Sequence, residues 1–300
     1  MTGVSLPRDQ ASRVFFWIAL LCLVWSSTWF AIRVCVRDQP PLTSAALRFV
    51  LAGVLMALLA PRLRKLEKAP SPPPPRWLWL TAGGTNFAGS YGILYVTETV
   101  VPSGIAAVLW GIFPLLMAGS GVLVLGERIA ARQWLGFVVA FFGIVTVFGG
   151  NLGGQEDALG PALCLLLSPI VSAVGTTLIK KFGSGTSSVV LNRNGMLFGA
   201  GLLGTAALLR EDPLHVVWTW NSFLATVYLG AFGTALTFGV YFWLLRTAPA
   251  SQLSLISYVT PILALLFGAA VGDGTMDTMA WLGGALVVLG VALVVRKAAR

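Results

Sequence analysis

Three ionisable side chains, Arg48, Glu98 and Arg193, lie within or beside long apolar stretches of this sequence. A charge is costly in a membrane interior, so each such residue is a candidate for binding a solute or moving a proton. Glu98 can bind a substrate amine or a coupling proton, or it can pair with Arg48, which is the interpretation we favour. The two roles predict opposite titration, because a carboxyl group isolated by burial has a raised pKa whereas one beside an arginine stays ionised.

Polar and aromatic side chains recur at helical spacing along several apolar stretches, since residues three or four apart share one face of a helix. Helix packing in a membrane uses the same spacing, and that alternative stays open. A cavity rich in aromatic rings and poor in charge favours amphipathic, neutral or zwitterionic solutes over phosphorylated ones, which need clustered lysine or arginine. The candidate cavity residues are Trp25, Thr28, Asn86, Ser90, Trp110, Ser172, Thr237, Tyr241, Gln252 and Tyr258.

Other chemistries find little support in the sequence. It contains no phosphate-binding GxxxxGK[ST] motif, so we expect no ATP hydrolysis by that route. The single histidine, His215, stands in a short loop, and Cys22, Cys35 and Cys164 lack the spacing of a metal or redox site. We therefore expect no catalytic residue, no metal and no cofactor. The alternatives are an intramembrane lipid-modifying enzyme, which would need converging catalytic groups, and a membrane scaffold that transports nothing.

The composition is that of a membrane protein with several spans. Hydrophobic residues make up 57% of the chain and charged residues 10%, against about 25% charged in soluble domains. A helix needs about 20 apolar residues to cross a bilayer. We expect an all-α fold of ten transmembrane helices, near residues 14–34, 42–60, 77–96, 102–124, 133–149, 159–179, 188–209, 221–244, 249–271 and 278–295.

The net charge of +9 is interpreted as a signal of orientation, not as a nucleic-acid patch. Basic residues are retained in cytoplasmic loops, and with a cytoplasmic N-terminus most lysines and arginines fall on that side. An even number of spans then returns the C-terminus to the cytoplasm. The expected partners are a small-molecule substrate and the lipid bilayer, and no nucleic acid. Gly195 with Gly199, and Gly268 with Gly272, have the spacing of close helix contacts, within one protomer or in a homodimer.

The sequence repeats itself after 147 residues. Pro102 and Pro114 recur as Pro249 and Pro261, and "WLG" at 134–136 recurs at 281–283. This predicts two five-helix units, residues 1–150 and 151–300. Because five is odd, the second unit must enter the membrane from the opposite face, as in carriers with inverted repeats and a site near the midplane.

Two of these prolines lie in the middle of predicted spans. Pro114 and Pro261 should bend their helices, because an interior proline removes a backbone hydrogen bond. Such kinks could shape a cavity between the halves or only improve packing, and both interpretations stay open.

Several motifs resemble a known family. "WSSTWFAIR" at 25–33, "VPSGIAAVL" at 101–109 and "WLGFVVAFFGI" at 134–144 are similar to the EamA family of the drug/metabolite transporter superfamily, with its YedA-like exporters. The resemblance covers almost the whole chain. It implies ten helices in two inverted repeats, a cavity lined by the first, third, fourth, sixth, eighth and ninth spans, and export of small metabolites or amino-acid-like compounds. It also implies a multi-pass location in the inner (plasma) membrane of the cell.

Overall fold

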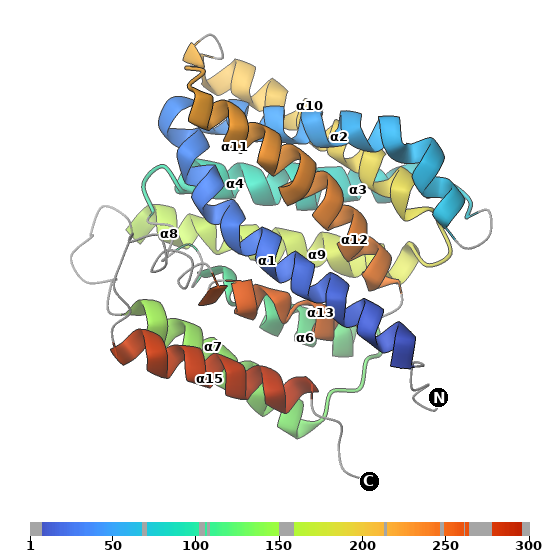
Figure 1. Ribbon diagram of the computed structural model, residues 1–300, viewed down its shortest axis with the longest axis vertical. Helices are drawn as coiled ribbons and strands as arrows, with labels where there is room; N and C mark the ends of the chain where they lie inside the picture. Colours follow the sequence, from blue (N-terminus) through green and yellow to red (C-terminus); the bar gives the residue numbers. More distant parts are fainter. Residues whose placement is uncertain are drawn as a thin grey trace.

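The computed structural model describes residues 8–67, 71–101, 106, 109–149, 159–212, 215–246, 249–260, 262–263 and 278–295. Within these ranges nearly all residues are helical and none is in a strand, as the apolar composition predicts. Most helices lie roughly side by side, and α7 and α15 form a pair at one edge of the molecule (Figure 1).

The described helices of the first half overlap the predicted spans. Residues 76–97 form a single helical stretch whose middle is a π-helical turn, η1. The bounds are Arg8–Asp38 for α1, Pro41–Leu66 for α2, Arg76–Ala82 for α3, Gly83–Gly89 for η1, Ser90–Thr97 for α4, Phe113–Leu123 for α6 and Ala131–Gly149 for α7.

The second half repeats this order, including the π-helical turn. The predicted span 159–179 is interrupted by a turn at Leu166, which separates α8 from α9. The bounds are Leu159–Leu165 for α8, Leu167–Phe182 for α9, Ser188–Arg210 for α10, Trp220–Gly230 for α11, Ala231–Leu236 for the π-turn η4, Thr237–Leu245 for α12, Ala250–Leu253 for α13 and Thr278–Val295 for α15.

By length and composition, four described stretches can cross a membrane: Val14–Asp38, Pro41–Lys65, Gly160–Phe182 and Trp220–Leu245. Shorter apolar helices cover Phe113–Leu123, Ala131–Thr146 and Trp281–Val294. The chain is therefore a helical membrane protein. The total of ten spans stays a prediction, because spans 102–124 and 249–271 fall partly outside the described residues.

The predicted kinks are described in only one half. Pro114 is the second residue of α6, and a turn at residues 111–112 separates this helix from the helical residues before it. The chain is therefore interrupted beside Pro114 instead of bending smoothly through it. Pro261 lies outside the described residues.

Helices at equivalent positions of the two halves pack against each other in antiparallel pairs. In α7 and α15, a Cβ added to Gly136 would lie 2.6 Å from the carbonyl oxygen of Gly290, and one added to Gly143 would lie 2.7 Å from that of Gly283. Gly136 and Gly143 correspond to Gly283 and Gly290 after 147 residues, so the contacts are reciprocal. Glycine is required on both sides because the backbones approach so closely.

The pair of α2 and α10 is held by one carboxylate at each end. Glu211, directly after α10, accepts hydrogen bonds from the backbone amides of Leu42 and Thr43 at 2.7 and 2.8 Å. Glu67, directly after α2, accepts from the hydroxyl of Ser187 at 2.7 Å and from the amide of Val189 at 3.3 Å. Each helix thus ends in a carboxylate that caps the N-terminus of the other, where the amides are unpaired and the helix dipole favours negative charge.

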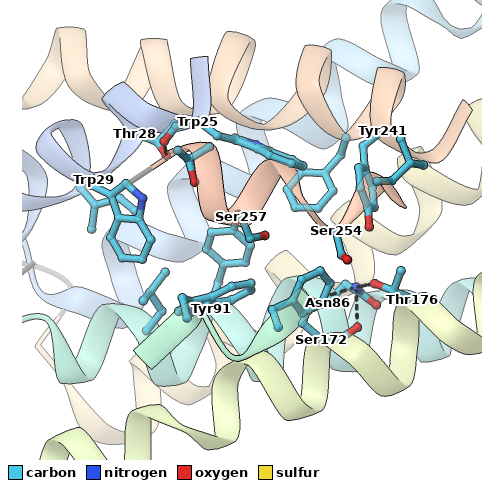
Figure 2. Close-up of a pocket in the computed structure, with 17 residues that line it drawn as sticks. Trp25, Thr28, Trp29, Asn86, Tyr91, Ser172, Thr176, Tyr241, Ser254 and Ser257 are labelled. Atoms are coloured by element: carbon cyan, nitrogen blue, oxygen red, sulfur yellow. Dashed lines mark hydrogen bonds between the residues drawn. The ribbon is translucent and has the colours of Figure 1, made fainter. Parts of the chain in front are cut away.

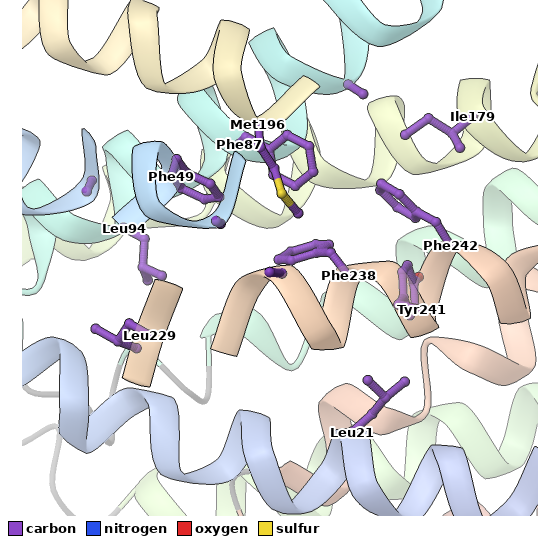
Figure 3. Close-up of a cluster of buried hydrophobic side chains, with 14 of the residues drawn as sticks. Leu21, Phe49, Phe87, Leu94, Ile179, Met196, Leu229, Phe238, Tyr241 and Phe242 are labelled. Carbon is purple, nitrogen blue, oxygen red and sulfur yellow. The ribbon is translucent and has the colours of Figure 1, made fainter. Parts of the chain in front are cut away.

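Aromatic side chains fill the space between α2, η1 and α12 (Figure 3). Phe87 lies in the middle, with its ring centroid 5.4 Å from that of Phe49 and 5.1 Å from that of Phe238. The Phe87 and Phe238 rings meet edge to face, the arrangement that aromatic quadrupoles favour. This cluster joins the two halves and supports one wall of the cavity described next.

Candidate functional site

A cavity of about 820 Å³, part of it open to solvent, lies among α1, η1, α4, α9, α12 and the segment that follows α13. Figure 2 shows side chains from these elements pointing into it. Six of the predicted residues line it, namely Trp25, Thr28, Asn86, Trp110, Ser172 and Tyr241. Eleven further residues complete the lining, namely Trp29, Ile32, Tyr91, Leu94, Phe113, Thr176, Phe238, Leu253, Ser254, Ser257 and Thr260.

Aromatic rings make up most of one wall. The ring centroid of Trp25 lies 5.6 Å from that of Phe238 and 5.5 Å from that of Tyr241. Figure 2 places Trp25 and Tyr91 on opposite walls, with Trp29 at one end. Rings arranged in this way bind flat or apolar parts of a ligand by stacking and edge contacts.

Asn86 forms the polar corner of the cavity together with α9. Its amide nitrogen donates to the carbonyl oxygen of Ser172 at 3.2 Å and to the hydroxyl of Thr176 at 2.9 Å, and its carbonyl oxygen accepts from Thr85 at 3.0 Å. A Cβ at Gly175 would lie 2.0 Å from that oxygen, so only glycine leaves room for the side chain. Asn86 lines the cavity as predicted, but its hydrogen bonds brace η1 against α9.

Two predicted residues miss the cavity by one position, and the same shift occurs in both halves. Ser90 and Thr237 are fully buried outside the lining, and Ser90 instead contacts the hydroxyl of Ser168 at 3.0 Å. Their neighbours Tyr91 and Phe238 line the cavity in their place. The cause is the π-turn before each residue, because an i to i+5 turn adds one residue and rotates the following helix.

The last two predicted residues belong to the segment around α13. Tyr258 does not line the cavity, since it packs in a second core cluster and donates to the carbonyl oxygen of Phe137 at 2.9 Å. Gln252 lies in α13, but its side chain is outside the described part of the structure. Ser254, which shares a helical face with Tyr258, and Ser257 line the cavity from this segment.

Arg48 is buried behind this lining, with 1% of its surface exposed. Its guanidinium donates to the hydroxyl of Thr234 at 2.6 Å, to the carbonyl oxygen of Gly233 at 3.0 Å and to the hydroxyl of Tyr95 at 3.3 Å. The same group lies 4.6 Å from the ring centroid of Tyr91. Arg48 therefore ties α2 to the π-turn η4 and supports a ring of the cavity wall by a cation–π contact.

The comparison with known families agrees with this architecture. The family model described as the EamA-like transporter family matches residues 12–149 and again residues 159–296, so both limits recur after 147 residues. The chain belongs to the EamA-like transporter family. The sequence resemblance is thus confirmed, and the family is described as one of transporters.

Relatives of this EamA-like chain span most of its length. The uncharacterized inner membrane transporter YedA of Escherichia coli (strain K12) is 32% identical over 282 residues, covering 91% of this chain and 88% of that protein. Protein PagO of Salmonella typhimurium is 27% identical over 263 residues, covering 86% of both chains. A solved crystal structure matches with a TM-score of 0.80 over 95% of this chain and 97% of its own, at 20% identity, which concerns the fold alone.

Glu98 follows the last residue of α4 in this EamA-like transporter. Both carboxylate oxygens are buried without a hydrogen-bond partner among the described residues, although the side chain as a whole is partly exposed. The favoured ion pair with Arg48 is not among the ion pairs of the described residues. Burial raises the pKa of Glu98 to about 8, against the opposing charges of Arg33 and Arg48. A raised pKa is the direction expected of a carboxyl group isolated by burial.

Proposed function

We propose that this protein is an integral membrane transporter that exports small metabolites, amino-acid-like or other amphipathic compounds by alternating access, without ATP hydrolysis. The observation that carries the proposal is the cavity between the halves, which both halves line with aromatic rings and small polar groups. Sites of this composition bind ligands with a flat or apolar body and a few polar atoms. The inner membrane of the cell is the proposed location, since YedA carries that description.

The antiparallel pairing of equivalent helices supports inverted repeats. A two-fold axis that relates two antiparallel helices must run perpendicular to them, and for membrane helices such an axis lies in the membrane plane. Repeats related in this way rock around a central site in many carriers. The reciprocal contacts of Gly136 with Gly290 and of Gly143 with Gly283 are those expected from such an axis.

The distribution of helix ends supports cytoplasmic termini. The start of α1 and the end of α15 point to the same end of the bundle (Figure 1). At the junction of α2 with α10, Glu67 lies 3.7 Å from Arg246, which follows α12. Basic residues that gather at one end of a bundle favour the cytoplasmic side.

The alternatives fit the site less well. A scaffold that transports nothing would need no cavity, whereas the described residues of both halves line a partly open one. An intramembrane enzyme would use ionisable groups at its centre, whereas the wall offers rings, hydroxyls and an amide, which suit binding more than bond making.

The proposal is tested by counterflow in proteoliposomes. Vesicles are preloaded with unlabelled amino acids, neutral aromatic compounds or drug-like cations, and uptake of each labelled counterpart is measured without an ion gradient. We expect counterflow of one class, lost in Trp25→Ala and retained in Trp220→Ala, because Trp25 lines the cavity and Trp220 is 72% exposed. Equal counterflow in both variants, or none for a folded protein, would contradict the proposal.

A further inference from the structure

Tyr241 presents a hydroxyl group to the cavity that no described protein group binds. The side chain is 4% exposed and its oxygen has no hydrogen-bond partner in the described part of the chain. Figure 2 shows the hydroxyl pointing toward Ser254 and the corner formed by Asn86 and Thr176. An unpaired buried hydroxyl costs the free energy of its desolvation, so its retention calls for a partner that enters from outside the protein.

Two more unpaired donors belong to the same cavity. The indole nitrogens of Trp25 and Trp110 are buried without a partner among the described residues. An indole N–H can only donate a hydrogen bond, whereas a tyrosine hydroxyl can donate or accept. All three side chains line the cavity. Their unpaired groups would therefore bind a ligand mainly through its hydrogen-bond acceptors.

Two acceptors at the polar corner already receive a hydrogen bond from the protein. The carbonyl oxygen of Asn86 accepts from Thr85, and the hydroxyl oxygen of Thr176 accepts from the amide of Asn86. Among the described lining residues there is no carboxylate. A ligand ammonium group would bring further donors to a cavity whose buried unpaired groups are two indole donors and one hydroxyl, with no carboxylate in the described lining to balance its charge.

We propose that the cavity selects a planar aromatic compound without a positive charge, whose carbonyl oxygen accepts a hydrogen bond from the hydroxyl of Tyr241. The aromatic body lies between Trp25 and Tyr91, which Figure 2 places on opposite walls. This inference rests on the proposed transport function and narrows its substrate class. It makes Tyr241 the residue that distinguishes an acceptor-bearing ligand from its purely apolar analogue.

The test uses the full chain in lipid nanodiscs and three bicyclic probes of similar size. Coumarin is neutral with a carbonyl acceptor, naphthalene has no acceptor, and 1-naphthylmethylammonium is a cation. Binding is measured by calorimetry, with empty nanodiscs subtracted. We expect coumarin to bind roughly three- to tenfold more tightly than naphthalene, the gain of one net hydrogen bond, and the cation to bind no more tightly than naphthalene.

Two tyrosine variants separate ligand binding from protein stability. Tyr241→Phe should abolish the preference for coumarin over naphthalene without lowering the Tm, because the lost hydroxyl has no described protein partner. The matched control is Tyr228→Phe, since the hydroxyl of Tyr228 lies 2.6 Å from that of Ser27 and outside the cavity lining. This control should keep the preference and lower the Tm.

Three results would overturn the inference: tighter binding of the cation than of coumarin, an unchanged preference in Tyr241→Phe, or a larger loss of Tm in Tyr241→Phe than in Tyr228→Phe. Counterflow with the same protein distinguishes these failures from a failure of the transport proposal. Tyr241-dependent coumarin binding without counterflow of any solute would contradict transport alone. Counterflow without the acceptor preference would contradict this inference alone.

Discussion

Arg48 and Glu98 are both buried at their charged groups, but they differ in their hydrogen bonds. Arg48 is fully engaged, because three acceptors from two other helical stretches surround its guanidinium. Glu98 is also buried at its oxygens, but these accept no hydrogen bond from the described residues. Because neutral hydrogen-bond acceptors already surround the guanidinium of Arg48, this cation does not need a carboxylate partner. No hydrogen bond or ion pair joins Glu98 to Arg48 among the described residues, although the sequence favoured such a pair.

The raised pKa of Glu98 makes stability depend on pH. The folded protein holds a proton on Glu98 up to a pKa of about 8, whereas the unfolded chain releases it near 4.5. Between these values the folded state binds more protons, so its free energy of unfolding falls as the pH rises. The groups that face Glu98 are Arg33 on α1, Arg48 on α2, and Tyr91 and Tyr95 on α4.

We therefore predict that Glu98→Gln is about as stable as the original protein at pH 5 and more stable at pH 9. The glutamine is neutral at both values, so it escapes the cost of a buried anion. Thermal unfolding in detergent across this range measures the difference. Parallel curves of Tm against pH would show that Glu98 does not carry the effect. If the same proton drives transport, counterflow in this variant also loses its dependence on pH.

The sequence predicted where several helices begin or end, but it did not predict the π-turns inside the helical stretches. Proline and charge mark the start of α2 at Pro41 and the end of α10 at Arg210, within two residues of the prediction. The π-turns carry glycine and threonine, in GGTNFAG and AFGTAL, but these residues also occur inside the α-helices, so they do not identify a π-turn. The inserted residue moves Tyr91 and Phe238 into the cavity, where helical spacing alone predicts Ser90 and Thr237.

The sequence also could not predict contacts between residues that are far apart in the chain. Glu67 and Ser187 are 120 residues apart, and nothing local identifies Glu67 as a cap.

Six cavity residues could be predicted because each shares a helical face with other polar residues. Trp29 lies four residues after Trp25, so the same helical spacing indicates it. Ser257 lies in the segment after α13, where the described chain includes a turn and helical spacing is a weaker guide.

The reciprocal carboxylate caps should stabilise the pair of α2 and α10. Glu211→Gln removes the negative charge from the N-terminus of α2 and one of two acceptors for Leu42 and Thr43. We expect a loss of about 0.5–2 kcal/mol, the usual contribution of a cap, visible as a lower Tm. The matched control is Asp212→Asn next to it, whose partner His215 is largely exposed. Equal effects of the two variants would contradict a specific cap.

The whole molecule is organised by the correspondence after 147 residues. It relates α2 to α10 and α7 to α15, and it nearly superposes the two π-turns, which begin at Gly83 and at Ala231, one residue after the equivalent of Gly83. The sequence alone predicted this duplication, because prolines and the "WLG" motif recur at one constant offset. It could not predict that equivalent helices contact each other, since an offset contains no information about which surfaces meet.

The inverted arrangement predicts that equivalent positions face opposite sides of the membrane. Arg64, near the end of α2, corresponds to Glu211, which caps the start of α2. A helix of 26 residues is about 39 Å long, more than the hydrocarbon core of about 30 Å. The exposed His215 lies 2.8 Å from Asp212, beside Glu211, and therefore at the end of α2 away from Arg64.

Single cysteines at these positions, in a background without Cys22, Cys35 and Cys164, test the arrangement with a membrane-impermeant maleimide. We expect His215→Cys to react in intact cells and Arg64→Cys to react only after lysis, because the basic end of α2 is retained in the cytoplasm. Reaction of both from the same side would contradict inverted halves. Reaction of Arg64→Cys alone in intact cells would reverse the orientation and keep the inversion, since the two positions would still lie on opposite faces.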